Sequence, residues 1–84
     1  MPKTSQRQRP SRDLEELRHI AGLSQRSLAF AAGVDPTTVL WAERGRIPAP
    51  ETQKRIAIAL GFALGREITA LDLWPLIDEK AATA

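Results

Sequence analysis

Apolar residues recur at helical spacing where the patterned part of the chain begins. Leu14, Leu17 and Ile20 follow one another every three residues, which places three apolar side chains on one face of a helix. We expect this helix to run over about residues 12–21, with Ser11 as its N-cap. Its apolar stripe predicts that one face packs against other helices while the opposite face meets water.

Two further helices are predicted on either side of a glycine turn. Ser24 is a favourable N-cap for a helix over residues 25–32, and Gly33 can adopt the positive φ that ends such a helix sharply. Asp35 then caps a third helix over residues 36–44, whose first residue is a proline, and the amide hydrogen that proline lacks would be unpaired there anyway. Two short helices joined by a glycine turn are typical of a helix-turn-helix unit.

A fourth helix and a shorter fifth helix follow a proline-rich connector. The fourth helix is expected over residues 50–64, with Ile56 and Leu60 on its inward face. Thr69, with Asp72 three residues later, resembles the capping box that opens a short helix. The chain thus contains about five short helical segments and no segment with the alternating pattern of a strand.

The helical pattern and the composition together predict one small all-α domain. A chain of 84 residues buries too little surface to form two separate cores. Alanine and leucine dominate the 43% of residues that are hydrophobic, which favours helices over strands. We expect a compact bundle in residues 11–78, preceded by a flexible basic arm (1–10) and followed by a disordered tail (79–84).

Positive charge is concentrated at the start of the chain. The first twelve residues carry four basic side chains, at Lys3, Arg7, Arg9 and Arg12, and no acidic one. The rest of the chain has eight basic and ten acidic residues. Two interpretations of the arm remain open: a disordered solubilising leader, or a segment that lies along DNA phosphates or in a minor groove.

Short motifs in the middle of the chain resemble those of one known family. From Leu17 to Gly61 the sequence contains AGLSQ, LA, AGV, AERG, PAPET and IAIALG, in the order and at the spacing of the lambdoid-repressor and Cro-like (XRE-type) helix-turn-helix proteins. The resemblance implies a lambda-repressor-like domain that binds double-stranded DNA and acts as a sequence-specific transcriptional regulator, with a repressor of Cro or phage type as the expected kind. It also implies a bacterial or phage-encoded protein of the cytoplasm, associated with the nucleoid.

The same resemblance assigns roles to individual residues. The helix that begins at Pro36 corresponds to the recognition helix, which enters the major groove. Base contacts are expected from Gln25, Pro36, Thr37, Thr38 and Trp41. Phosphate contacts, which position the protein without reading the sequence, are expected from Arg7, Arg9, Arg26, Arg44, Arg46, Lys54 and Arg55.

A helical wheel of the third helix shows an unusual outward face. Val39 and Ala42 share the direction that must face the core. The outward direction is shared by Thr37, Leu40, Trp41 and Arg44. Three interpretations of Leu40 and Trp41 remain open: cover by the chain that follows, contact with the methyl group of thymine, or contact with a protein partner.

Other kinds of chemistry find little support in the sequence. Glu43 lies nearer the packed side of the third helix, so we expect it to make a structural hydrogen bond or ion pair. The chain has no cysteine, and its one histidine, His19, lies off the apolar stripe and is expected on the surface. We therefore expect no enzyme activity, no metal, no cofactor and no small-molecule ligand. No apolar run reaches the length of a membrane span.

The C-terminal part is rich in apolar residues and has two interpretations. Six of the ten residues in 68–77 are large and apolar, namely Ile68, Leu71, Leu73, Trp74, Leu76 and Ile77. They either close the small core or form a homodimer interface, and we expect a homodimer, at least on DNA, through this segment. A dimer would present two recognition helices one turn of DNA apart, ~34–36 Å.

Two further classes of function remain possible on the same scaffold. One is an antitoxin-like interaction module, whose main task is to bind another protein and whose DNA binding is secondary. The other is a nucleoid-associated protein with little sequence preference. Binding of random duplex DNA at two salt concentrations separates the first class from the DNA-binding classes, because phosphate contacts make affinity fall steeply with salt.

Overall fold

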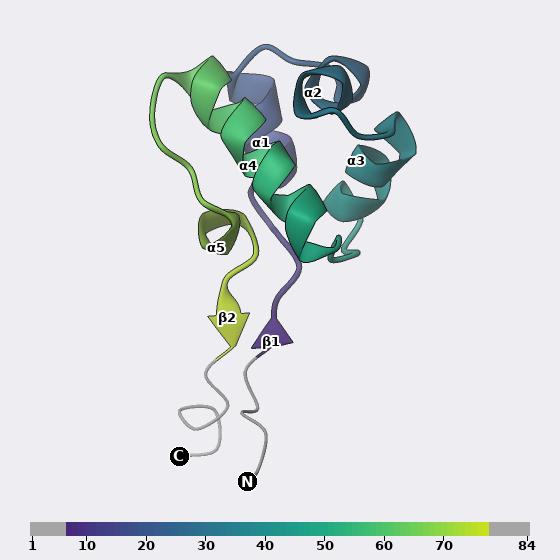
Figure 1. The fold of residues 1–84 in the computed structure, drawn as a ribbon, viewed down its shortest axis with the longest axis vertical. Helices are drawn as coiled ribbons and strands as arrows, with labels where there is room; N and C mark the ends of the chain where they lie inside the picture. The colour runs from purple at the N-terminus through teal and green to yellow at the C-terminus, as the bar shows by residue number, and fades with distance from the viewer. Residues whose placement is uncertain (1–6, 78–84) are drawn as a thin grey trace, which may run out of the picture.

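The computed structural model describes residues 7–77, and in this range five helices form one bundle (Figure 1). The all-α class expected from the sequence is confirmed. One pair of very short strands, which the sequence pattern did not indicate, joins the two ends of the described chain. The elements are β1 (Arg7–Gln8), α1 (Leu14–Ile20), α2 (Gln25–Ala32), α3 (Pro36–Glu43), α4 (Pro50–Leu64), α5 (Ala70–Leu73) and β2 (Leu76–Ile77).

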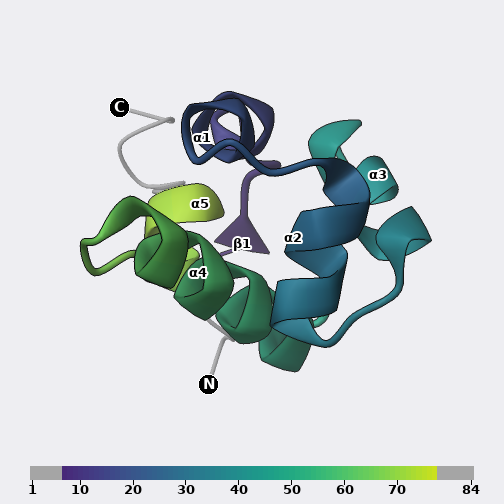
Figure 2. The same cartoon turned by 90° about the horizontal axis from the view of Figure 1, so that it is seen from above.

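The core is formed by residues from all five helices and is centred on α4. Both views place α3 and α5 on opposite sides of the bundle (Figures 1 and 2). Fully buried side chains come from α1, α2, α3 and α4, and Trp74 closes the core from the end of α5. They include Leu14, Leu28, Val39, Ile56, Leu60 and Trp74. This apolar cluster fixes α3 so that only one of its faces is left for a ligand.

The predicted helix boundaries from α2 onward are confirmed, because local caps determine them. The Ser24 hydroxyl accepts a hydrogen bond from the backbone N–H of Ser27 at 2.9 Å, and Gly33 takes a left-handed φ of 73°. The Thr69 and Asp72 side chains form the expected capping box at the start of α5. Only the end of α3 differs slightly, since Arg44 is its C-cap instead of its last residue.

The first helix departs from the sequence prediction in two ways. It begins at Leu14, two residues later than expected, and the buried Ser11 hydroxyl accepts a hydrogen bond from the Leu14 N–H at 3.1 Å without being the N-cap. Ile20, expected on the inward stripe, is 64% exposed. Arg18 is buried in its place, because a carboxylate of α3, that of Glu43, meets its guanidinium.

The described part of the expected N-terminal arm is paired with the rest of the chain. Residues 7–8 pair antiparallel with residues 76–77, and the Arg9 N–H donates to the Pro75 carbonyl at 2.8 Å. The amides of Gln8 and the buried Gln53 of α4 exchange two hydrogen bonds, at 2.7 and 2.8 Å. Residues 7–9, in the segment expected to be a flexible arm, are therefore tied to the bundle by hydrogen bonds. Residues 1–6 and the expected tail of residues 79–84 lie outside the described residues.

Candidate nucleic-acid interface

Helix α3 presents a face to solvent that matches the helical wheel. Val39 and Ala42 are completely buried against the other helices. On the opposite side Pro36, Thr37 and Trp41 are exposed, while Thr38 is half-buried. Three of the four α3 residues expected to contact bases are thus exposed at the start or on the outer side of one helix, and Thr38 is only partly accessible. Such a helix can enter a groove of DNA without disturbing the core.

The N-terminal end of α3 carries a negative charge. The Asp35 carboxylate accepts a hydrogen bond from the Thr37 N–H at 2.8 Å, and this bond lowers the pKa of Asp35 below its ordinary value of 3.8. Asp35 is therefore ionised at neutral pH and would repel a phosphate at this end. Positive charge is found instead beyond the last turn of α3, where Arg44 and Arg46 are both exposed.

Trp41 connects these two arginines. The guanidinium carbon of Arg44 lies 5.8 Å from the centroid of the Trp41 ring, and that of Arg46 lies 5.5 Å from it. The ring is 42% exposed, and Leu40 beside it is half-buried. The following chain therefore covers Trp41 only in part, so the ring remains available to a ligand. An open hollow of about 390 Å³ adjoins it, with Thr37 and Pro48 also on its wall.

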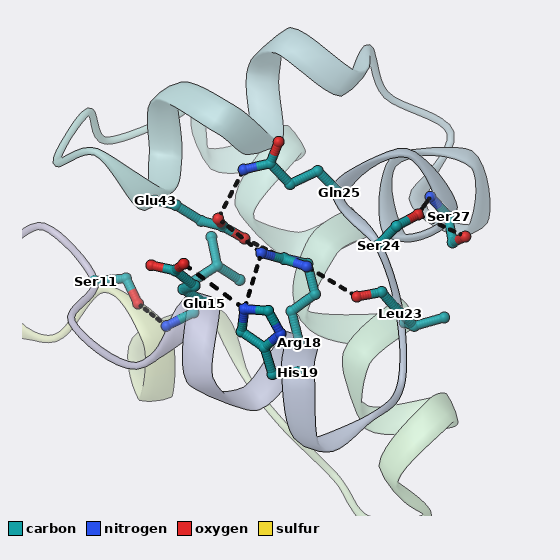
Figure 3. Close-up of polar contacts among 10 residues, drawn as sticks. Ser11, Glu15, Arg18, His19, Leu23, Ser24, Gln25, Ser27 and Glu43 are labelled. Carbon is teal, nitrogen blue, oxygen red and sulfur yellow. Dashed lines mark hydrogen bonds and ion pairs between the residues drawn. The ribbon is translucent and has the colours of Figure 1, made fainter.

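Gln25, the fifth expected base contact, is bound within the protein. Its side-chain amide donates a hydrogen bond to the Glu43 carboxylate at 2.9 Å (Figure 3). The same carboxylate accepts from the Nε and Nη2 atoms of Arg18 at 2.5 and 3.2 Å. One carboxylate at the end of α3 thus ties together α1, α2 and α3, and it orients the α3 face that is available to a ligand.

The structural role expected for Glu43 is confirmed, whereas its partner was not found from the sequence. Both side chains of the pair are nearly inaccessible, at 8% exposure for Arg18 and 4% for Glu43. Arg18 also donates to the Leu23 carbonyl at 2.9 Å, which satisfies more of its guanidinium. The sequence offered one indication of this pair: Glu43 lies on the packed side of α3, and a buried carboxylate needs a cation from another helix. Residue patterns within α1 alone assign Arg18 to the surface.

The remaining basic residues named as phosphate contacts lie on several elements. Arg26 in α2 and Lys54 in α4 are exposed. Arg55 in α4 is exposed but pairs with Glu51 at 3.2 Å, one turn earlier. Arg7 and Arg9 belong to β1 and the residue after it, at the end of the molecule below α4 in Figure 1. The structure therefore brings Arg44 and Arg46 next to the expected base contacts and disperses the others.

The part of the chain that the structure describes has no metal-binding cluster and no membrane-spanning helix. Within residues 7–77, no group of three or more histidine or acidic side chains could hold a metal ion. Among the described helices none is long and apolar enough to cross a membrane. His19 is exposed, as expected, and lies 3.7 Å from Glu15.

Comparison with known proteins agrees with this geometry. Residues 11–71 match the family model of the helix-turn-helix domain, which covers α1 to α4 and the start of α5. No curated protein and no solved structure matches the chain. Helix α2, the Gly33 turn and α3 are the two helices and the turn for which this family is named. The chain therefore belongs to the helix-turn-helix family of DNA-binding, non-enzymatic domains.

Proposed function

We propose that this protein is a sequence-specific transcriptional regulator that inserts α3, from Pro36 onward, into the major groove of its operator. The observation that carries the proposal is the division of α3 into a buried face, Val39 and Ala42, and an exposed face with no carboxylate beyond Asp35. Occupation of an operator is the mode of action that we propose. That is the mode of a repressor of Cro or phage type. Binding to its operator would locate the protein at the nucleoid.

The exposed face of α3 supports a reading mode with few hydrogen bonds. Thr37 supplies a hydroxyl and a methyl group, and Thr38 is half-buried beside it. Trp41 supplies apolar surface that can contact the methyl group of thymine. The Gln25 amide nitrogen already donates a hydrogen bond to Glu43, so we propose that Gln25 acts first in holding α3. DNA shape would supply the rest of the specificity.

Two measurements test DNA binding and sequence reading separately. Affinity for a random duplex, followed by fluorescence anisotropy, is expected to fall steeply as salt rises. Absence of binding even at low salt contradicts the proposal. Selection of bound sequences from a random pool is then expected to return a defined site, and Thr37→Ala is expected to relax preference at one base position. An unchanged preference removes Thr37 from the base contacts.

We also propose that the protein acts as a homodimer, through a face different from the one expected from the sequence. In residues 68–77, Ile68, Leu73 and Trp74 are buried in the chain's own core, so this segment mainly closes the bundle. The most exposed apolar side chain of α4 is Phe62, at 91% exposure, with Ile58 at 60% one turn before it. A hollow of about 570 Å³ lies beside them.

A second copy of the chain suits this α4 face because the face is self-complementary. A twofold interface needs a projection and a recess on the same patch, and Phe62 projects beside the hollow that it helps to line. Arg66 and Glu67, of opposite charge, border the hollow, so each can face the other residue of the second copy.

The dimer has a matched pair of test variants. Phe62→Asp is expected to give a monomer in analytical ultracentrifugation, because it places a charge on both sides of the interface. Phe30→Asp changes an equally exposed phenylalanine of α2, at 88%, and is expected to leave the dimer intact. A wild-type protein that stays monomeric at all concentrations, alone and on its operator, refutes the homodimer and favours the interaction-module alternative for this face.

A further inference from the structure

Three features of α3 and the residues after it converge on Trp41. The first is its carbonyl group, which accepts backbone hydrogen bonds from the N–H groups of both Arg44, at 3.1 Å, and Arg46, at 2.9 Å. The second is its ring, which has both guanidinium groups within 5.8 Å of its centroid. The third is Gly45, whose φ of 110° turns the chain back so that Arg46 returns to Trp41.

Neither Arg44 nor Arg46 has a charged partner among the described residues. Arg18 and Arg55 are paired with Glu43 and Glu51, whereas no carboxylate lies within ion-pair distance of Arg44 or Arg46 in residues 7–77. Each guanidinium keeps five N–H donors in a planar fork that matches a phosphate. Two positive charges held beside one ring repel each other, and a bound anion relieves that repulsion.

We infer that Trp41 is a positioning residue that holds Arg44 and Arg46 as a paired phosphate clamp at the C-terminal end of α3. The inference rests on the proposed DNA-binding function and specifies how one part of that surface works. A long exposed arginine loses rotamer freedom when it binds a phosphate, and this loss costs conformational entropy. Contact with a fixed aromatic ring already restricts the arginine in the free protein, so less entropy is lost on binding. The clamp also explains why a large apolar ring occupies an outward position on the helix.

The salt dependence of DNA binding tests the clamp, because it counts phosphate contacts. Each contact contributes about 0.9 to the slope of log affinity against log salt concentration. Arg44→Ala/Arg46→Ala is expected to lower the slope by about two units. Trp41→Ala removes no charge, yet it is expected to lower the slope by at least half as much. Trp41→Phe keeps an aromatic face and is expected to retain most of the slope.

Two control variants separate positioning from direct contact. Leu40→Ala removes a neighbouring apolar side chain and is expected to leave the slope unchanged. The triple variant Trp41→Ala/Arg44→Ala/Arg46→Ala is expected to have the slope of the double arginine variant, because the ring contributes to the slope only through the arginines. Thermal melting followed by circular dichroism verifies that each variant is folded. If Trp41→Ala does not fold, the slope of Trp41→Phe is compared with that of the wild-type protein instead.

The outcomes distinguish the clamp from the proposed function. If the wild-type protein binds random duplex with a steep slope, and Trp41→Ala weakens binding without changing that slope, the ring contacts a base directly and the clamp is wrong. The clamp is also wrong if Trp41→Phe lowers the slope as much as Trp41→Ala does, because an aromatic ring at this position would then not hold the arginines. If the wild-type protein binds no duplex at low salt, the proposed function fails, and the clamp with it.

Discussion

Removal of the Glu43 carboxylate is expected to destabilise the whole domain. In Glu43→Ala, the buried Arg18 keeps its bond to the Leu23 carbonyl but loses both bonds to the carboxylate, and the Gln25 amide loses its acceptor. A buried charge left without its partner costs about 3–5 kcal/mol. The free energy of unfolding of native proteins is about 5–15 kcal/mol, so the variant is expected to lose a large share of its stability.

Thermal and urea denaturation followed by circular dichroism measure this loss. In a domain of this size 1 kcal/mol corresponds to about 4–8 °C in melting temperature, so a fall of at least ~12 °C is expected. The matched control is Glu51→Ala, which breaks the exposed pair with Arg55 and is expected to cost about 0.2–1 kcal/mol. If the two variants lose equal stability, the Arg18–Glu43 pair does not hold α1 against α3.

A double variant tests whether the cost comes from the unpaired charge. Arg18→Met/Glu43→Leu replaces both charged groups by apolar side chains of similar length, and such replacements of buried pairs are often neutral or stabilising. We expect the double variant to melt closer to the wild-type protein than Glu43→Ala does. Additive losses would show that the packing around the pair, not the uncompensated charge, accounts for the effect.

Three further predictions concern packing, pH and the N-terminal strand. Gly61→Ala is expected to cost about 1–3 kcal/mol in urea denaturation, because its Cβ would lie 2.6 Å from the Arg66 carbonyl oxygen; an unchanged midpoint contradicts this. The cap bond lowers the pKa of Asp35 in the folded state, so its contribution is present above pH 3.8 and is lost as the pH falls through the lowered pKa. Asp35→Asn is expected to lack this pH dependence. If the melting temperatures of the wild-type protein and Asp35→Asn change in parallel with pH, the predicted contribution of Asp35 is refuted. Gln8→Ala leaves the buried Gln53 amide without one partner, and a loss of about 1–3 kcal/mol in urea denaturation is expected, with no loss as the contrary result.

The sequence by itself determined the helices and the turn of this domain. Ser24, Gly33 and Asp35 act on backbone groups within a few residues of themselves, so their effect can be read without knowledge of the fold. The buried positions of α3 and α4 also follow from spacing alone, because a helix that packs on one side repeats its apolar residues with its own period. The outward direction of Thr37 and Trp41 was predictable for the same reason.

Only the tertiary structure decided the contacts between residues far apart in the chain. Arg18 and Glu43 are 25 positions apart, and Gln8 and Gln53 are 45 apart. A pattern of residue types assigns such polar side chains to the surface, since burial becomes favourable only when packing brings a partner to each of them. The same applies to Gly61 within α4, where the Arg66 carbonyl from beyond the helix passes too close for a Cβ. Local physics specified the helix-turn-helix unit, and long-range polar pairing decided how β1 and α3 are held.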